Sequence, residues 1–180
     1  MIIYHDIFND DEILTDSYKY EVEDDFCYVF EAKSTTKKGT EITDAMIGGN
    51  ASAEDAPDAL DDPTAETGLD VILNNNLYLN ENFGEKKAFR ALMKSLIGKM
   101  KSKLEPEYFQ GVFKSNMEKF VKKMTPEIEE YSIYFGETGQ YIAKEDLVAV
   151  SACPIFVRYD DSGCSAKVYM LKDFVYEEKA

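Results

Sequence analysis

The fold of this chain is decided by residues 84–126, which read GEKKAFRALMKSLIGKMKSKLEPEYFQGVFKSNMEKFVKKMTP. Apolar residues recur there at intervals of three and four on both sides of Pro106, the spacing that places side chains on one face of a helix. They are Phe89, Leu92, Met93, Leu96, Ile97, Met100 and Leu104, then Phe109, Val112, Phe113, Met117, Phe120, Val121 and Met124. Pro106 disfavours helix at the residue before it and suits the first turn of a new helix. The stretch predicts a hairpin of helices of about 20 and 16 residues, about 30 and 24 Å long at 1.5 Å per residue, closed by Thr125 and Pro126.

This predicted hairpin is basic, whereas the rest of the chain is acidic. Residues 84–126 hold 11 lysines and arginines against 4 glutamates, a net charge of +7, while the whole chain carries −15. Separate surfaces of opposite charge steer different partners. We therefore expect the lysines, among them Lys94, Lys101, Lys119 and Lys122, to face solvent and to bind acidic protein partners. The alternative is that they only keep two long helices soluble.

Length and composition restrict the class of protein. A chain of 180 residues with 44% hydrophobic residues is long enough for one domain with a substantial core. No apolar run approaches the roughly 20 residues of a membrane span, and residues 1–10 lack the features of a signal peptide. Cys27, Cys153 and Cys164 have no framework spacing, which indicates reduced thiols in a cytoplasmic protein. The excess of 35 acidic over 20 basic residues argues against nucleic acid as a general partner.

Strand patterns flank the hairpin on both sides. Apolar or alternating runs predict strands at 1–4, 17–22, 26–32, 68–73, 77–83, 131–135, 147–153, 155–159 and 166–171. Residues 6–16 are interpreted as an acidic, turn-rich connection, and Asp160, Asp161, Ser162 and Gly163 mark a tight hairpin turn. Strands before and after a helical excursion predict an α+β fold rather than alternating βαβ units.

Residues 39–67 differ in character from the segments beside them. They contain Gly48, Gly49, Pro57 and Pro63, many acidic residues, and no lysine or arginine. This composition predicts a long flexible acidic loop, most mobile at 51–65, which serves either as a solvated charged segment or as a binding element. The ligand spacing of an EF-hand is absent, so we expect calcium to bind only weakly, through clustered carboxylates.

A motif within this loop connects the chain to a known family. Residues 47–54, Ile-Gly-Gly-Asn-Ala-Ser-Ala-Glu, closely resemble the signature of the translationally controlled tumour protein family. The signature positions are Ile47, Gly48, Gly49, Asn50, Ser52 and Glu54. The resemblance extends to residues 1–4, 68–72 and 177–179 and to the basic hairpin. A second family signature corresponds to Tyr134, Phe135, Gly136 and Glu137.

This resemblance implies a single domain over 1–180 with the β-tent fold shared with the Mss4 family. Its β core, of mixed or antiparallel strands, would comprise 1–38, 68–83 and 131–180, with the flexible loop at 39–67 and the helical hairpin at 84–126 projecting from it. Many family members end in a cysteine where this chain has Ala180, which favours a monomer. Relatives of this fold that hold zinc use paired Cys-x-x-Cys knuckles, and the three cysteines here do not have that spacing.

The sequence offers little for catalysis. His5 is the only histidine, so neither a Ser-His-Asp set nor a histidine-activated cysteine is expected, and no phosphate-binding loop with its lysine is present. We interpret His5 as a solvated strand residue and Cys27 as a small residue at the edge of the core. Glu12, beside Asp10 and Asp11, is the acid that we single out, although by its chemistry alone it is a solvated side chain.

The resemblance implies two functions. The first is a non-catalytic cytosolic interaction protein without a cofactor, which binds calcium weakly and binds tubulin and microtubules through the basic hairpin. In this role it would also associate with translation elongation factors and anti-apoptotic Bcl-family proteins in growth regulation. The alternative is a regulator of nucleotide exchange on a Rheb-like small GTPase through Glu12 and residues 47–54. A carboxylate near a nucleotide site can compete with phosphates for Mg²⁺ or for the P-loop lysine. We favour the first function.

Overall fold

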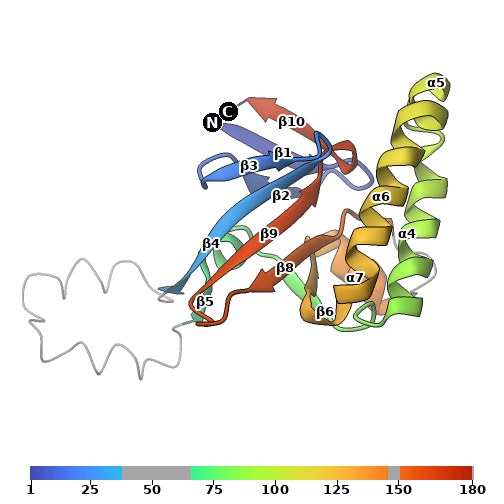
Figure 1. The fold of residues 1–180 in the computed structure, drawn as a ribbon. Helices are drawn as coiled ribbons and strands as arrows, with labels where there is room; N and C mark the ends of the chain where they lie inside the picture. Colours follow the sequence, from blue (N-terminus) through green and yellow to red (C-terminus); the bar gives the residue numbers. More distant parts are fainter. Residues whose placement is uncertain (38–65, 146–150, 180) are drawn as a thin grey trace, which may run out of the picture.

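The strands on both sides of the hairpin come together in two antiparallel sheets, and the hairpin lies along one side of them (Figure 1). The structure, a computed structural model, describes residues 1–37, 66–145 and 151–179. Their arrangement confirms the predicted α+β fold. Most of the expected flexible loop at 39–67 and the whole first signature at 47–54 fall within 38–65, outside the described residues, and the last two residues of the expected loop belong to a strand.

The larger sheet carries most of the predicted strands, in the order β3-β4-β9-β8-β7-β6, with β5 paired to β4. The strands are β3 (Tyr20–Glu23), β4 (Cys27–Lys37), β5 (Glu66–Leu69), β6 (Tyr78–Asn80), β7 (Ser132–Phe135), β8 (Ile155–Tyr159) and β9 (Ser165–Leu171). The longest pairing, β4 with β9, runs from Cys27 opposite Leu171 to Lys33 opposite Ser165. The predicted turn between β8 and β9 is confirmed, with Gly163 at a φ of 72° that favours glycine.

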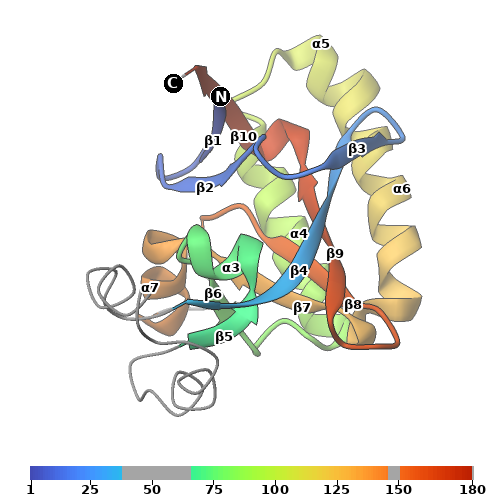
Figure 2. The same ribbon diagram turned by 90° about the vertical axis from the view of Figure 1, so that its left-hand side faces the viewer.

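The smaller sheet brings the two ends of the chain together. Its strands, in the order β10-β1-β2, are β10 (Val175–Lys179), β1 (Ile2–Asp6) and β2 (Glu12–Thr15). Ile2 lies opposite Lys179, and the two termini are neighbours in Figure 2. The interpretation of 6–16 as connection alone was wrong, and β10 was not predicted. Both strands carry acidic residues at exposed positions and only a few buried apolar residues, Ile13, Leu14 and Val175. The sequence therefore lacks the alternating pattern that predicts a strand.

The hairpin forms as predicted, with different helix lengths. The first helix is α4 (Lys86–Met100), and the second runs through α5 (Pro106–Tyr108), a π-helical turn at Phe109–Phe113 and α6 (Lys114–Met124). Most of the apolar residues are buried, but Val112 is 46% exposed. Its predicted burial was wrong because the π-helical turn adds a residue and shifts the helical phase. A helical turn at Thr125–Glu130 follows α6.

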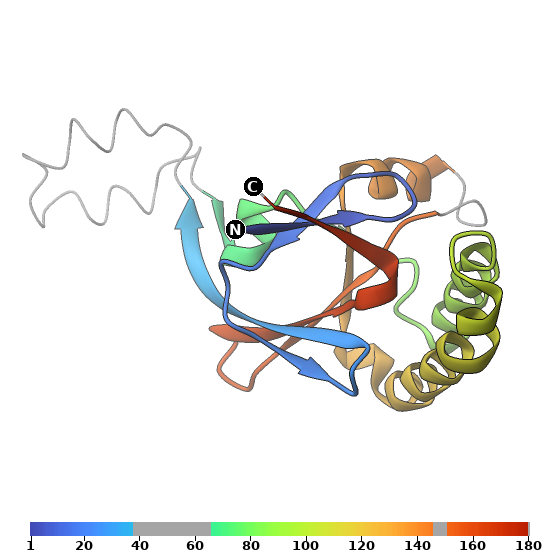
Figure 3. The ribbon, with the colours of Figure 1, turned by 90° about the horizontal axis from the view of Figure 1, so that it is seen from above.

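The hairpin lies along the larger sheet (Figure 3), and aromatic contacts fasten it there. The ring of Phe156 in β8 lies between Phe89 of α4 and Phe120 of α6, with centroid distances of 5.7 and 5.3 Å. Phe113 packs on Phe174 near the start of β10. The apolar face of the hairpin is therefore part of the main core, and its polar face is turned outward.

Three other local predictions need correction. The strand expected at 68–73 ends at Leu69, and helix α3 (Asp70–Asn74) begins there, with Val71 and Ile72 buried in the core. Asp70 Oδ1 accepts hydrogen bonds from the amides of Val71 and Lys33, which fixes this change of direction. Helix α7 (Glu137–Glu145) was not predicted.

The third correction concerns the strand predicted at 147–153. Its first part lies outside the described residues, and 151–153 form no strand. Among the three free cysteines, Cys27 and Cys153 are buried and Cys164 is exposed. Among the described residues, no helix has the length and apolar character needed to cross a membrane.

Candidate functional site

Glu12 lies at the start of β2, exposed, at the edge of a polar hollow. This hollow of about 240 Å³, here called the acidic pocket, is lined by Asp11, Glu12, Asn74, Asn75, Asn76 and Glu137. Its walls come from the β1–β2 turn, the end of α3 and the start of α7, three segments far apart in the sequence. Glu12 and Glu137, which the sequence singled out for different reasons, are thus brought to one place.

The second signature reaches the acidic pocket through its last residue, Glu137. Tyr134, Phe135 and Gly136 are buried, and the chain turns there from β7 into α7. A Cβ on Gly136 would lie 3.0 Å from Asp11 Oδ2, so glycine allows the turn to approach Asp11 closely. The glycine of this signature therefore has a packing role.

Asp11 is the fixed acid of the pocket. Its carboxylate accepts hydrogen bonds from the amide of Thr138 at 2.9 Å and from the Thr138 hydroxyl at 2.7 Å. These bonds join the β1–β2 turn to the first turn of α7, where a carboxylate is favourable. The Glu12 side chain has no hydrogen bond or ion pair to the described residues. The two neighbouring acids thus differ: Asp11 holds the pocket together, and Glu12 is available to a partner.

Three asparagines lie opposite these acids, where α3 ends and the chain turns toward β6. Asn76 has a φ of 53°, a left-handed conformation that asparagine tolerates better than most residues. The Asn75 side chain donates to the Val71 carbonyl at 2.7 Å and so closes the end of α3. Their position in the pocket could not be inferred from the sequence, because it depends on how α3 packs.

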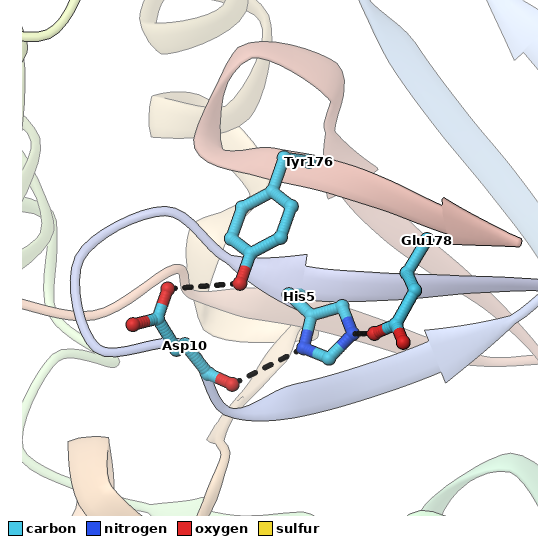
Figure 4. Close-up of polar contacts among 4 residues, drawn as sticks. All are labelled: His5, Asp10, Tyr176 and Glu178. Carbon is cyan, nitrogen blue, oxygen red and sulfur yellow. Dashed lines mark hydrogen bonds and ion pairs between the residues drawn. The ribbon is translucent and has the colours of Figure 1, made fainter.

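His5 is a second tertiary feature beside the pocket, and its interpretation as solvated was wrong. It is 7% exposed, in the middle strand of the smaller sheet, opposite Glu12 on one side and Tyr176 on the other. As Figure 4 shows, its ring nitrogens face the Asp10 carbonyl at 3.2 Å and Glu178 Oε2 at 2.5 Å, and Tyr176 donates to the Asp10 carboxylate. These four residues, here called the His5 cluster, hold the turn that leads into Glu12.

A buried carboxylate, Asp6, anchors the other side of this turn. It accepts hydrogen bonds from the amides of Phe8 and Cys153 at 2.8 and 2.7 Å. Burial raises the pKa of Asp6 to about 6, against the effect of these donors. Within the described residues, no group of three or more histidine, cysteine or acidic side chains is arranged to hold a metal ion.

The basic candidate residues lie on the helical hairpin. A groove of about 710 Å³ runs between α4 and α6, here called the basic groove, and it is lined by Arg90, Met93, Lys94, Ile97, Lys114, Met117, Glu118, Val121 and Lys122. Its floor is apolar and its rim is mainly cationic. Lys94 and Lys122 are on the rim, whereas Lys101 and Lys119 are exposed outside the groove. The four predicted lysines therefore divide into two pairs.

The lysines on the rim are not neutralised. Neither Lys94 nor Lys122 forms an ion pair with any of the described residues. Lys123, on the side of α6 away from the groove, pairs with Glu23 of β3 and ties the hairpin to the sheet. The signature residues Ile47, Gly48, Gly49, Asn50, Ser52 and Glu54 lie outside the described residues, so their relation to either surface stays a prediction.

Comparison with known proteins decides the family. A family model described as "Translationally controlled tumour protein" matches residues 1–175. The chain belongs to this family. A *Drosophila melanogaster* family homologue is 37% identical over 140 residues, covering 77% of this chain and 80% of that protein, and one from *Branchiostoma belcheri* is 32% identical over 99% of each.

Solved structures of the translationally controlled tumour protein family agree with this assignment. The *Schizosaccharomyces pombe* protein p23fyp is similar over the full length of both chains, with a TM-score of 0.68 and 26% identity. The *Caenorhabditis elegans* protein gives a TM-score of 0.62 at 26% identity, over 100% of this chain and 99% of that one. The fold expected from the resemblance is thus confirmed.

Proposed function

We propose that this chain is a non-catalytic, cytosolic interaction protein whose basic groove binds acidic segments of partner proteins, with tubulin tails and translation elongation factors as candidates. The observation that carries the proposal is the groove itself, with an apolar floor and a rim of cations that have no ion-pair partner among the described residues. Unpaired cations on a rigid helix pair attract acidic chains without first losing an internal partner.

The floor of the groove adds to this attraction. Met93 and Met117 are buried there, while Ile97 and Val121 are partly exposed. Methionine side chains are flexible and adapt to different apolar groups. A partner that combines carboxylates with an apolar side chain would therefore bind better than a chain of carboxylates alone. Glu118 interrupts the cationic rim and would disfavour an acid placed directly opposite it.

Two matched charge-reversal variants test the proposal. Lys94→Glu/Lys122→Glu changes the rim of the groove, and Lys101→Glu/Lys119→Glu makes the same change in net charge outside it. We expect the first pair to weaken binding to microtubules or to an elongation-factor complex more than the second, in a co-sedimentation or pull-down assay. Binding should also weaken steeply between low and physiological salt, because the screening length shortens to about 8 Å. Equal losses in both variants would mean that only the total charge matters, and unchanged binding in both would refute the proposal.

The excess of carboxylates in this chain supports the weak calcium binding that forms part of this proposal. Its carboxylates come without a coordinating loop, so affinity on the order of millimolar is expected. A calorimetric titration should give a weak heat that fades with added salt. A single site of high affinity that is insensitive to salt would contradict this part.

Nucleotide exchange on a Rheb-like GTPase is the second candidate function, favoured by the position of Glu12. Glu12 is exposed and unpaired beside Glu137 in the acidic pocket, on a turn that other residues hold in place. Such an acid could reach a Mg²⁺ ion or a P-loop lysine without a conformational change. Glu12→Gln should then abolish release of a fluorescent nucleotide from the GTPase, while Glu129→Gln, an exposed acid elsewhere, should not. Equal release with and without the wild-type chain would remove this candidate.

A further inference from the structure

The His5 cluster has a property that neither proposed function uses. His5 lies in β1 and joins this strand to the turn around Asp10, which follows it in the sequence, and to β10 at the far end of the chain. Its ring stacks on Tyr176 with the centroids 5.0 Å apart and the planes 10° from parallel. Asp10 has a φ of 63° and its amide donates to the Asp6 carbonyl, so the turn is tightly folded at this point.

Both hydrogen-bond partners of the ring are acceptors. Nδ1 faces a backbone carbonyl and Nε2 faces the carboxylate of Glu178. A neutral imidazole has one N–H donor, whereas the imidazolium has two. Only the protonated ring donates to Asp10 and Glu178 together. In the neutral ring, one nitrogen lone pair would face an oxygen lone pair across a partly buried contact.

The groups around the ring favour the proton. Those facing it are Glu178 and Tyr176 from β10, Asp10 from the turn, and Glu12 from β2, and none of them is a cation. Burial lowers the pKa of His5, but the Asp10 carbonyl, Glu178 and Glu12 outweigh burial and raise it above its ordinary value.

The strand that His5 holds is otherwise weakly attached. β10 is an edge strand whose last four described side chains, Tyr176 to Lys179, are exposed. Apart from its pairing with β1, it is held by the buried Val175 at its start, by the His5 cluster and by a hydrogen bond from Tyr28 to Glu177 at 3.2 Å. Edge strands with few buried contacts open more readily than the rest of a sheet.

We propose that the proton on His5 is a switch, which fastens β10 and the Asp10 turn to β1 when present and loosens both when it is lost. The stabilisation is complete below the ordinary histidine pKa of about 6.5 and disappears as pH rises through the pKa in the folded chain. Because the turn leads directly into Glu12, the geometry of the acidic pocket would follow the same proton. The switch belongs to the free chain and does not depend on which partner is bound.

The test uses the full-length chain and two measurements. Because the chain has one histidine, an NMR titration of the ring gives the pKa of His5 without ambiguity. Amide exchange, corrected for its intrinsic dependence on pH, reports the opening of 10–12 and 176–179. We expect His5 to titrate above about 6.5 and exchange in both segments to rise several-fold as pH passes that value, while amides in β4 and β9 show no such step.

Two variants that each remove one charge from β10 separate the switch from a general charge effect. The amide introduced by Glu178→Gln can accept from a protonated ring or donate to a neutral one, so this change should lower the pKa of His5 and abolish the step in exchange. Glu177→Gln removes a charge from the other face of β10 and keeps an acceptor for Tyr28, so the step should persist. A His5 pKa at or below the ordinary value would overturn the proposal, as would exchange without a step or an equal loss of the step in both variants.

Discussion

The acidic pocket and the basic groove are built in opposite ways. The acidic pocket takes its lining from three distant segments, and three of its six side chains are held by hydrogen bonds: Asp11 by Thr138, Asn74 by the Tyr18 hydroxyl and Asn75 by the carbonyl of Val71. The basic groove comes from one continuous stretch of sequence, and its rim lysines 94 and 122 have no ion-pair partner among the described residues. The first surface depends on tertiary contacts, so changes to its hydrogen-bonded side chains should alter folding. The second depends on helix periodicity, so changes to it should alter binding and leave folding nearly intact.

The largest expected effect separates the apolar side of the hairpin from its basic side. Phe120 is 3% exposed and packs on Phe156 and Phe26, so Phe120→Ala should lower the free energy of unfolding by about 3–5 kcal/mol. Val112→Ala, at an exposed position of the same helical run, should change it by less than about 0.5 kcal/mol. Urea denaturation of both variants checks this. Similar losses would mean that the hairpin does not contribute its apolar face to the main core.

The next effect is a dependence of the free energy of unfolding on pH, which arises from the buried carboxyl group of Asp6. The pKa of Asp6 is raised to about 6 in the folded chain, so between about pH 4 and 6 the folded state binds this proton more tightly than the unfolded chain. The free energy of unfolding should therefore fall as pH rises through this range, by up to about 3 kcal/mol from this group. Asp160, whose pKa is lowered to about 2 by Ser162 and Ser165, acts in the opposite direction and below this range.

Two measurements check the role of Asp6. A carbon-13 titration of its carboxyl group should give a midpoint near 6, and Asp6→Asn should flatten the slope of stability between pH 4 and 6. A carboxyl group that titrates near 4 would contradict the prediction even if the variant does not fold.

A smaller effect distinguishes the two neighbouring acids of the pocket. In Asp11→Asn, the side-chain NH₂ group replaces one of the two oxygens that accept from Thr138, so one Thr138 donor loses its acceptor. This change should lower the free energy of unfolding by about 1–3 kcal/mol. Glu12→Gln changes an exposed, unpaired side chain and should cost less than about 0.5 kcal/mol. Thermal and urea unfolding measure both. If Glu12→Gln were the more destabilising change, Glu12 would be a structural residue and its proposed availability to a partner would be wrong.

The smallest effect is expected on the stability of the basic groove. Lys94→Glu gains an attraction to Arg90 one turn away, and Lys122→Glu gains a repulsion from Glu118, each worth about 0.2–0.5 kcal/mol and of opposite sign. The double variant should therefore unfold within about 0.5 kcal/mol of the wild-type chain, whatever its effect on binding. Circular dichroism melts provide the measurement. A large destabilisation would show that these lysines have structural contacts after all.

The sequence by itself determined the hairpin and its two faces. A run of apolar residues at three- and four-residue spacing specifies a helical face through local geometry alone, and Pro106 fixes the start of the second helix for the same local reason. Most strands of the larger sheet were also visible, because β4, β8 and β9 have long or strongly apolar patterns. The exposure of Lys94, Lys101, Lys119 and Lys122 followed directly from the helical phase.

Only the tertiary structure decided where the acidic residues lie relative to one another. Nothing in the spacing of Asp11, Asn75 and Glu137 indicates that they meet, because their positions depend on how β2, α3 and α7 pack after long excursions of the chain. The same holds for His5, whose burial requires a strand from the far end of the sequence to supply Tyr176 and Glu178. Local periodicity reports which face of an element is apolar, but contacts between distant segments arise from packing, which a single sequence does not display.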